Sequence, residues 1–283
     1  MVTPQAKKEA AQVMIEIHHL SQRRSCRLVG LERNTCRYQS KPEDTKALEA
    51  KIQAIAFERR RFGYRRIHMI LKRSGMTINH KKVWRIYREL GLKVKKRSGR
   101  KRALSVRVKR EKAMKPNERW SLDFVSDALM NGRKIRLLTI IDEFTRESLR
   151  ITVDSSLGGE RVTRELDAVI AERGLPERIQ SDNGTEFTSK AVIEWFENKG
   201  IKWEYIEPGK PYQNGCIESF NGKLRDECLN EHWFLNITET REIVEKWRRD
   251  YNESRPHSAL KGRTPSQLAS QLEGPSAHAL GCA

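Results

Sequence analysis

Three acidic residues stand where a carboxylate could do chemistry. Asp123 interrupts the apolar run WSLDFV (120–125), Asp182 ends the run ERIQSD, and Glu218 lies in the segment PYQNGCIESFNGKLRDE. An ionised carboxylate inside an apolar strand is costly unless it is paired or binds a metal ion. Converging carboxylates offer the oxygen ligands that Mg²⁺ selects, and a pair of such ions can activate a hydroxyl and stabilise the leaving oxygen of a phosphodiester. The three acids are therefore candidates for a metal-dependent site that acts on phosphodiesters.

Each acid taken alone also fits a simpler role. The sequence Asp-Asn-Gly at 182–184 is first of all a turn, because these residues tolerate the backbone angles that turns need. A glutamate on an exposed helix face is commonplace. It is the combination of the three acids that favours a site.

The elements around the acids are expected to bring them together. Two-residue alternation puts Asp123 on the strand face opposite to the large apolar residues of its run. Asp182 ends a strand, at the edge where ligands of α/β sheets commonly bind. Glu218 belongs to the polar stripe of a predicted helix, whose core-facing stripe is separate. The polar stripe holds Asn214, Glu218, Asn221 and Arg225, and the apolar one Ile217, Phe220, Leu224 and Cys228.

The segment from 117 to 232 mixes strand-like and helical patterns. Strand-like runs lie at 120–125, 135–142 and 149–153, and a helical pattern follows that ends at Gly174. A strand, a helix, a strand, a loop rich in Pro and Gly, and another helix come next. This order predicts an α/β sandwich with a mixed sheet.

Positive charge is concentrated in the N-terminal part of the chain. Residues 1–110 hold 31 Lys and Arg against 8 Asp and Glu, whereas residues 111–283 hold 25 against 29. Such an asymmetry is typical of a polyanion-binding region joined to a part that is not generally basic. A membrane surface is the rival polyanion, but no basic helix here has the Trp- or Phe-rich apolar face of an interfacial anchor. The charge therefore favours nucleic acid.

Two segments of this basic part have the outline of a helix-turn-helix. In 21–38, Ser21 can cap a helix, Gly30 permits a turn and a second helix begins near Glu32. In 62–92, Gly75 ends one helical stripe, and Thr77 or Asn79 can cap the next. Any helical hairpin gives a similar sequence pattern, so the pattern alone does not establish a helix-turn-helix. The cations on the second segment could also form a solvated charged face that binds no DNA. From 93 to 112 the chain reads as a basic linker that tracks DNA phosphates. The candidate DNA contacts are Arg33, Arg37, Lys81, Lys82, Arg85, Arg88, Lys95, Lys96 and Arg97.

Several classes of protein are disfavoured. No stretch reaches the roughly 18 apolar residues of a membrane span, and Glu16 and His18 interrupt the apolar run near the N-terminus, which argues against a secretory signal. The five cysteines form no C-x-x-C pair, so neither a disulfide framework nor a zinc site is indicated. We expect a cytoplasmic protein.

The chain resembles the transposases of bacterial insertion sequences, whose catalytic domain is like that of retroviral integrases. WSLDFV, SDNGTEF and PYQNGCIESFNGKLRDE carry the resemblance, with 35 residues between Asp182 and Glu218. SQRRSCRLVGLERNTCRY, FGYRRI (62–67) and YNESRPHSALKGRTP (251–265) extend it over nearly the whole chain. These segments favour the second-reading-frame protein of the large two-frame insertion-sequence group, and they imply association with a bacterial nucleoid.

The resemblance implies a ribonuclease-H-like catalytic core in which Asp123, Asp182 and Glu218 bind two Mg²⁺ ions, with Mn²⁺ as a substitute. The implied reaction cuts strands at the element ends and joins them to target DNA, with Arg225 against DNA. The implied partners are double-stranded DNA, further copies of the chain, and the upstream-frame protein, separate or fused by frameshifting. Two rival functions stay open: an inert DNA-binding regulator of the element, and a nuclease that hydrolyses without joining.

We therefore expect an α/β fold with a mixed sheet flanked by helices, preceded by helical DNA-binding segments. The expected order is a helix-turn-helix region (1–60), a second one (61–92), a basic linker (93–116), the catalytic core (117–232), and a C-terminal helical segment and tail (233–283). In that last region, YNESRPHSALKGRTP is expected mainly to pack the last helix against the core, because its prolines interrupt helices.

Overall fold

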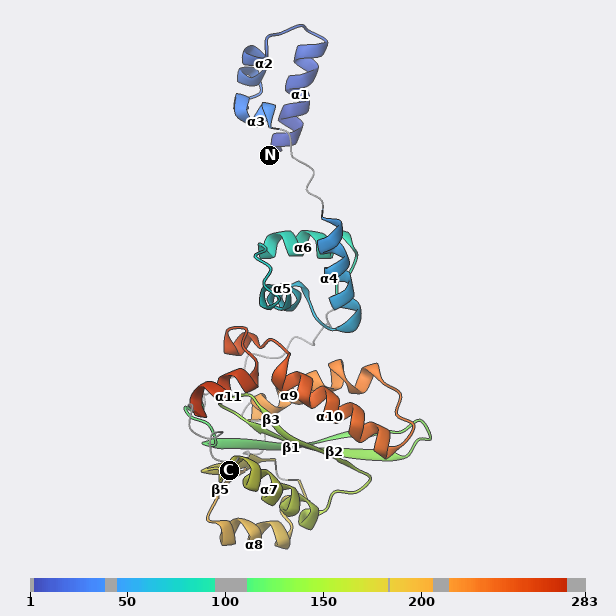
Figure 1. Ribbon diagram of the computed structural model, residues 1–283, viewed down its shortest axis with the longest axis vertical. Helices are drawn as coiled ribbons and strands as arrows, with labels where there is room; N and C mark the ends of the chain where they lie inside the picture. The colour runs from blue at the N-terminus through green and yellow to red at the C-terminus, as the bar shows by residue number, and fades with distance from the viewer. Residues whose placement is uncertain (1–2, 39–44, 95–110, 183, 206–213, 274–283) are drawn as a thin grey trace, which may run out of the picture. The chain divides into compact units, whose positions relative to one another are not determined.

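The computed structural model describes residues 3–38, 45–94, 111–182, 184–205 and 214–273 (Figure 1). The chain divides into two compact units, Met1–Ala50 and Lys51–Ala283. Among the described residues, no helix has both the length and the apolar character that crossing a membrane requires.

The first unit is built from three short helices, α1 (Pro4–Glu16), α2 (Gln22–Leu28) and α3 (Arg33–Arg37). The Ser21 hydroxyl accepts a hydrogen bond from the Arg24 N–H and so caps α2, as predicted. Gly30 has a φ of +61°, which lets the chain turn between α2 and α3. Cys26 and Cys36 are buried free thiols that pack in the core of this unit.

A helical hairpin follows the unit boundary, which falls within α4 (Lys46–Glu58). The hairpin consists of α5 (Tyr64–Arg73) and α6 (His80–Glu89). Of the two predicted caps, Asn79 is the one that accepts the Lys81 N–H at 2.9 Å. The stripe predicted to be core is largely buried: Ile67, Leu71, Val83, Ile86 and Tyr87. The second helix-turn-helix outline is therefore confirmed as a folded hairpin.

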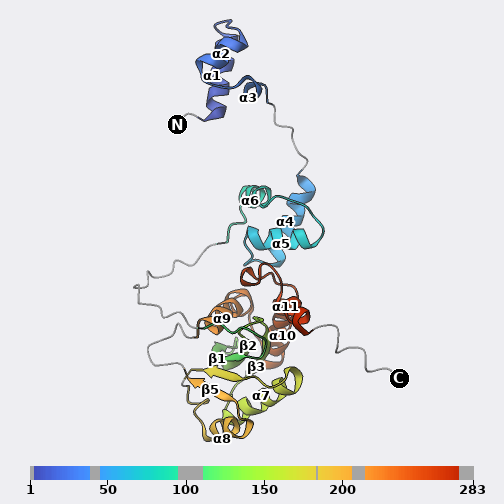
Figure 2. The same ribbon diagram turned by 90° about the vertical axis from the view of Figure 1, so that its left-hand side faces the viewer.

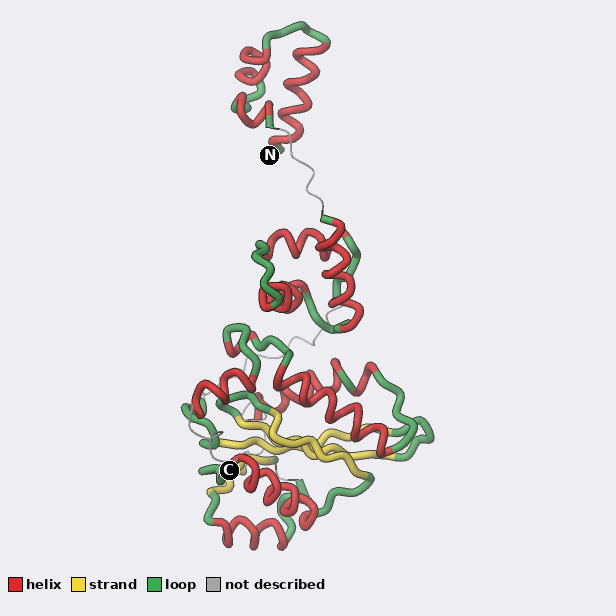
Figure 3. The backbone as a smooth tube through the Cα atoms, viewed as in Figure 1, coloured by secondary structure: helices red, strands yellow, loops and turns green. Residues whose placement is uncertain are grey.

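The remainder of the second unit contains a five-stranded mixed sheet (Figure 3). Its strands are β1 (Arg119–Ala128), β2 (Lys134–Asp142), β3 (Ser148–Asp154), β4 (Arg178–Ser181) and β5 (Lys202–Tyr205). Their order is β3-β2-β1-β4-β5, with β3, β2 and β1 antiparallel and β1, β4 and β5 parallel. The predicted mixed sheet is confirmed.

Helices cover both faces of the sheet (Figures 1 and 2). One face packs against α7 (Gly159–Arg173) and α8 (Lys190–Lys199), and the other against α9 (Gly215–Glu227) and α10 (Ile237–Glu253). The short helices η2 (Leu229–Glu231) and η3 (Ser258–Leu260) and the helix α11 (Pro265–Glu273) complete the unit. The fold is a ribonuclease-H-like α/β core, with helical segments before it.

The alternation of β1 divides its side chains between these two cores. Trp120 and Leu122 are fully buried with α7 and α8, whereas Val125 is buried with α9 and α10. Asp123 therefore lies on the side of the sheet that α9 covers. This places the first candidate acid next to the helix that carries the third.

Candidate active site

The three acids come from neighbouring elements at one part of the sheet. Asp123 lies in the middle of β1, Asp182 directly follows β4, and Glu218 is in the first turn of α9. β1 and β4 are parallel neighbours, paired as far as Ser121 with Gln180. Extending this register by two residues places Asp182 level with Asp123, on strands about 4.8 Å apart.

The electrostatics of Asp123 reflect this arrangement. Burial, followed by the negative charges of Asp182 and Glu218, raises the pKa of Asp123 to about 6, even though hydrogen bonds from Phe124 and Asn221 lower it. Asp123 is half-buried, whereas Asp182 and Glu218 are exposed. The three carboxylates therefore act on one another, and a bound cation would relieve their repulsion.

Asn221 links Asp123 to the helix of Glu218. Its side-chain amide donates to a carboxylate oxygen of Asp123 at 2.8 Å, and its carbonyl oxygen lies 3.0 Å from the Thr139 hydroxyl. Thr139 is the partner of Asp123 across the β1–β2 ladder. Because Asn221 is one helical turn after Glu218, this network fixes the end of α9 that carries Glu218 against the sheet. The sequence pattern places Asn221 on the polar stripe of α9 but indicates no role for it.

The carboxylates are engaged with protein donors in this structure. Asp123 also accepts the Phe124 N–H at 2.7 Å, and Asp182 accepts the Gly184 N–H at 3.1 Å. Within the described ranges, no group of three or more His, Cys, Asp and Glu side chains is arranged as a ready-made metal site. The candidate donors are all carboxylate oxygens, which are the ligands that a hard cation such as Mg²⁺ prefers.

One member of the predicted polar stripe behaves differently. Asn214 is buried, not aligned with Glu218 on the exposed stripe. It is the N-cap of α9 with φ −100° and ψ 15°, so it lies outside the regular helix and helical spacing does not apply to it. The expected apolar stripe of α9 is confirmed, since Ile217, Phe220, Leu224 and Cys228 are buried.

The candidate DNA contacts lie on several elements. Arg33 and Arg37 are exposed on α3 of the first unit, and Lys81, Arg85 and Arg88 are exposed on α6 with Lys82 half-buried. Arg225 donates to the Ser126 carbonyl at 2.9 Å, which ties it to β1. Lys95, Lys96 and Arg97 lie outside the described residues.

A buried ion cluster fixes the far end of α9. Arg255 donates two hydrogen bonds to the Glu227 carboxylate, both at 2.7 Å, and Arg66 donates a third at 3.0 Å. Burial alone would raise the pKa of Glu227, but the bonds and charges of Arg255 and Arg66 outweigh it and lower that pKa. The Phe62 ring lies 5.0 Å from the Arg66 guanidinium and 5.8 Å from that of Arg255. The segments FGYRRI and YNESRPHSALKGRTP thus meet at Glu227.

The C-terminal segment packs α10 against the sheet, as predicted. The Asn252 side chain accepts the Ser148 N–H and donates to the Ser148 carbonyl, both at 2.9 Å, and so pairs with the backbone of β3. The prolines of this segment predict the packing role, but no sequence pattern indicates the contact of Arg255 with α9.

Comparison with known protein families matches most of the chain. The family described as "Integrase core domain" matches residues 113–211, a second family of the same description matches residues 199–265, and the "HTH-like domain" family matches residues 42–101. These matches cover the hairpin of α5 and α6, the sheet and all three candidate acids.

Individual relatives come from bacterial insertion elements. The chain is 48% identical to an uncharacterized 39.2 kDa protein of insertion element IS476 from Xanthomonas euvesicatoria, over 95% of this chain and 78% of that protein. It is 32% identical to a putative transposase, InsK for insertion sequence element IS150, from Escherichia coli (strain K12), over 83% of this chain and 87% of that protein.

A solved structure shares the fold. It is the cryo-EM structure of the simian T-cell lymphotropic virus intasome in complex with PP2A regulatory subunit B56 gamma. The similarity has a TM-score of 0.50 at 16% sequence identity, and it covers 82% of this chain and 76% of that one. At this identity the likeness concerns the fold alone, which is that of an integrase catalytic core.

Proposed function

Because this chain belongs to the bacterial insertion-sequence transposases with an integrase core domain, we propose that it cuts DNA at the ends of its element and joins the freed strands to target DNA. The observation that carries the proposal is the placement of Asp123 in β1, Asp182 at the end of the neighbouring strand β4 and Glu218 in the first turn of α9. The substrate is double-stranded DNA, and the reaction is phosphoryl transfer between a hydroxyl and a phosphodiester.

Asp123, Asp182 and Glu218 would hold two Mg²⁺ ions, for which Mn²⁺ can substitute. When bound, such ions activate the attacking hydroxyl and stabilise the leaving oxygen of the phosphodiester. Asn221 positions Asp123 through its amide and so ties Asp123 to the helix that carries Glu218. In the first step, water attacks a phosphodiester at the element end, so that a P–O bond to water forms as the bond to the 3′ oxygen breaks, which gives a 5′ phosphate and a 3′ hydroxyl. In the second step that hydroxyl attacks a target phosphodiester, and one bond forms for each bond broken.

The basic surfaces of the chain would hold the DNA. We assign phosphate contacts to the exposed cations of α3 and α6, namely Arg33, Arg37, Lys81, Arg85 and Arg88, and to the half-buried Lys82. Arg225 on α9, and Lys95, Lys96 and Arg97 after α6, are assigned the same role from their positions in the sequence. Transfer of two element ends requires further copies of the chain on the DNA. A second proposed partner is the upstream-frame protein, either as a separate chain or fused to this one.

A strand-transfer assay tests the proposal. Labelled element ends are given to the wild type and to Asp182→Asn, in Mg²⁺ and in EDTA. We expect joined product only from the wild type with the metal. Asp127→Asn is the matched control, because Asp127 lies on β1 four residues beyond Asp123 and accepts its neighbour's N–H at 2.8 Å, a bond that asparagine can keep.

The rival functions give different outcomes in the same assay. Cut but unjoined ends from the wild type would indicate a nuclease that hydrolyses without joining. DNA that is bound but never cut, with or without the upstream-frame portion fused to the chain, would indicate an inert regulator. Equal joining by Asp182→Asn and the wild type would refute the assignment of the acids.

A further inference from the structure

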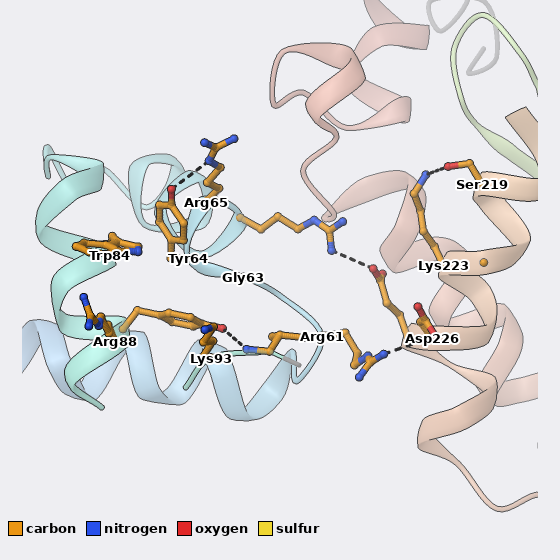
Figure 4. Close-up of a pocket in the computed structure, with 15 residues that line it drawn as sticks. Arg61, Gly63, Tyr64, Arg65, Trp84, Arg88, Lys93, Ser219, Lys223 and Asp226 are labelled. Carbon is orange, nitrogen blue, oxygen red and sulfur yellow. Dashed lines mark hydrogen bonds and ion pairs between the residues drawn. The ribbon is translucent and has the colours of Figure 1, made fainter. Parts of the chain in front are cut away.

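A wide cleft in the second unit separates α5 and α6 from α9. Its volume is about 1550 Å³. Small-molecule sites usually measure about 300 to 1,000 Å³, so this cleft is large enough for a segment of a polymer. In Figure 4, Tyr64, Trp84 and Arg88 lie on one side of the cleft, and Ser219 and Lys223 on the other. The second wall begins at Ser219, directly after Glu218.

Ion pairs across the cleft engage its acidic residues. Arg66 donates to Glu227 at 3.0 Å, and Arg61 lies 3.6 Å from Asp226. Four further cations line the cleft and form no ion pair within 4 Å among the described residues: Arg65, Arg88, Lys93 and Lys223. The cleft therefore carries an excess of positive charge, which suits a polyanion.

Trp84 is placed as a stacking platform. Its side chain is 45% exposed although tryptophan is among the largest apolar residues, and it lines the cleft. The Arg88 guanidinium lies 5.6 Å from the centre of the Trp84 ring, and Arg65 lies 5.9 Å from that of Tyr64. Exposed aromatic rings beside cations are the features with which proteins bind single-stranded nucleic acid, because every unpaired base has a face to stack. The bases of an intact duplex are already stacked on one another and cannot reach such a ring.

Lys223 connects the cleft to the candidate active site. It is five residues after Glu218 on α9, which is about 7.5 Å along the helix axis. Its ammonium lies 3.2 Å from the Ser219 hydroxyl, on the cleft wall. Burial, together with the positive charge of Arg255, lowers the pKa of Lys223 to about 8. Because Ser219 and Lys223 both line the cleft and Ser219 directly follows Glu218, a strand in the cleft would lie beside the helix that carries Glu218.

We propose that this cleft binds an unpaired DNA strand at the end of the element, with a base stacked on Trp84 and its phosphates beside Arg88, Lys93 and Lys223. This inference rests on the proposed transposase function, because it assumes that DNA ends reach Glu218. It adds a binding site for unpaired nucleotides and a preference for ends whose last base pairs are open.

The test uses an element-end duplex with unpaired terminal nucleotides, a fluorescent aminopurine at the last base, and EDTA to prevent cutting. We expect the wild type to bind this end about tenfold more tightly than a fully paired one and to quench the aminopurine. Trp84→Ala should lose both effects, and Trp84→Phe should retain most of each. Trp233→Ala is the matched control, since Trp233 is 82% exposed and does not line the cleft.

A second pair of variants avoids the loss of a large side chain. Gly222 faces the cleft from α9, and a Cβ there would meet nothing within 4 Å. Glu and Gln are both better helix formers than Gly, so Gly222→Glu and Gly222→Gln should fold. We expect Gly222→Glu to weaken binding of the unpaired strand about tenfold more than Gly222→Gln does, because it places a negative charge beside the phosphates.

The outcomes separate this inference from the proposed function. If Trp84→Ala quenches the aminopurine and prefers the open end as the wild type does, the cleft is not the strand site, while metal-dependent joining still supports a transposase. If the wild type shows Trp84-dependent quenching but never yields joined product, the cleft binds an unpaired strand and the proposed function fails.

Discussion

The amide nitrogen of Asn221 lies 2.8 Å from a carboxylate oxygen of Asp123, which joins the middle of β1 to the helix that carries Glu218. The Thr139 hydroxyl fixes the other end of the same amide at 3.0 Å, so the orientation of Asn221 follows from its two partners. Two acids from distant parts of the chain thus depend on one neutral side chain for their relative position.

Asn221→Ala should therefore loosen the position of Asp123 relative to Glu218 while all three acids remain in the chain. A hydrogen bond to a charged group contributes about 1.5 to 3 kcal/mol, so we expect the free energy of unfolding to fall by about that amount. Joined product should decrease more than cutting in single-turnover assays, because joining requires both the hydroxyl and the target to be aligned. Asp127→Asn, a change on β1 four residues beyond Asp123, is the control. Unchanged stability and unchanged rates for Asn221→Ala would show that the hydrogen bond positions nothing.

Magnesium should stabilise the folded chain if the three acids bind it. A ligand that binds only the folded state raises the free energy of unfolding, and each kcal/mol corresponds to about 2 to 4 °C in melting temperature for a chain of this size. We expect Mg²⁺ to raise the melting temperature of the wild type and of Asp127→Asn, and to have little effect on Asp123→Asn. Equal shifts in all three proteins would place the bound ions elsewhere.

Local sequence patterns predicted much of this fold because they report local physics. Two-residue alternation identified β1, and a side-chain cap identified the start of α2. The proximity of Asp123 to Asp182 depends on the parallel pairing of β1 with β4, which the order of strands in the sequence does not specify. The roles of Asp123, Asp182 and Glu218 as metal ligands stay a prediction.

Other features could not be predicted because they join segments far apart in the sequence. Arg66 and Glu227 are 161 positions apart, and no local pattern indicates that they meet. The apolar pattern of α6 does not indicate that Trp84 is exposed, and the folded structure is needed to show it. The role of Asn221 depends on the β1–β2 register, which fixes Thr139 opposite Asp123.

The Glu227 cluster should be a strong local determinant of stability. Arg255→Met leaves the buried Glu227 carboxylate with one fewer guanidinium, and breaking a buried ion pair costs about 3 to 5 kcal/mol. We expect urea unfolding to show a loss in that range. The double variant Arg255→Met with Glu227→Gln should recover part of it, because the uncompensated charge is gone.

Arg249→Met provides the comparison for this measurement. Arg249 is 68% exposed and bonds to Glu245 at 3.0 Å on the surface of α10, where such pairs contribute about 0 to 1 kcal/mol. Similar losses for Arg249→Met and Arg255→Met would contradict the assignment of a buried cluster.

The buried His257 should make the chain sensitive to acid. Burial, followed by the positive charge of Arg255, lowers the pKa of His257 from its ordinary value of 6.5 to about 3. The folded state thus keeps this ring neutral, whereas the unfolded state takes up a proton once the pH falls below 6.5. Stability is therefore fully present above pH 6.5 and is lost as the pH falls toward 3, by about 2 to 3 kcal/mol between pH 6.5 and 4.5.

His257→Gln tests this dependence because glutamine can donate to the Tyr251 carbonyl, which the ring contacts at 3.2 Å, but does not titrate. We measure urea unfolding of the wild type, His257→Gln and His80→Gln, the last at an exposed histidine on α6, at several pH values between 4.5 and 7.5. The difference in unfolding free energy between the wild type and His257→Gln should change with pH, because only the wild type loses the contribution of a neutral ring. His80→Gln should follow the wild type. A constant difference between the wild type and His257→Gln across this range would mean that the ring titrates alike in both states, and the contact of the C-terminal segment with α9 would then be open to water.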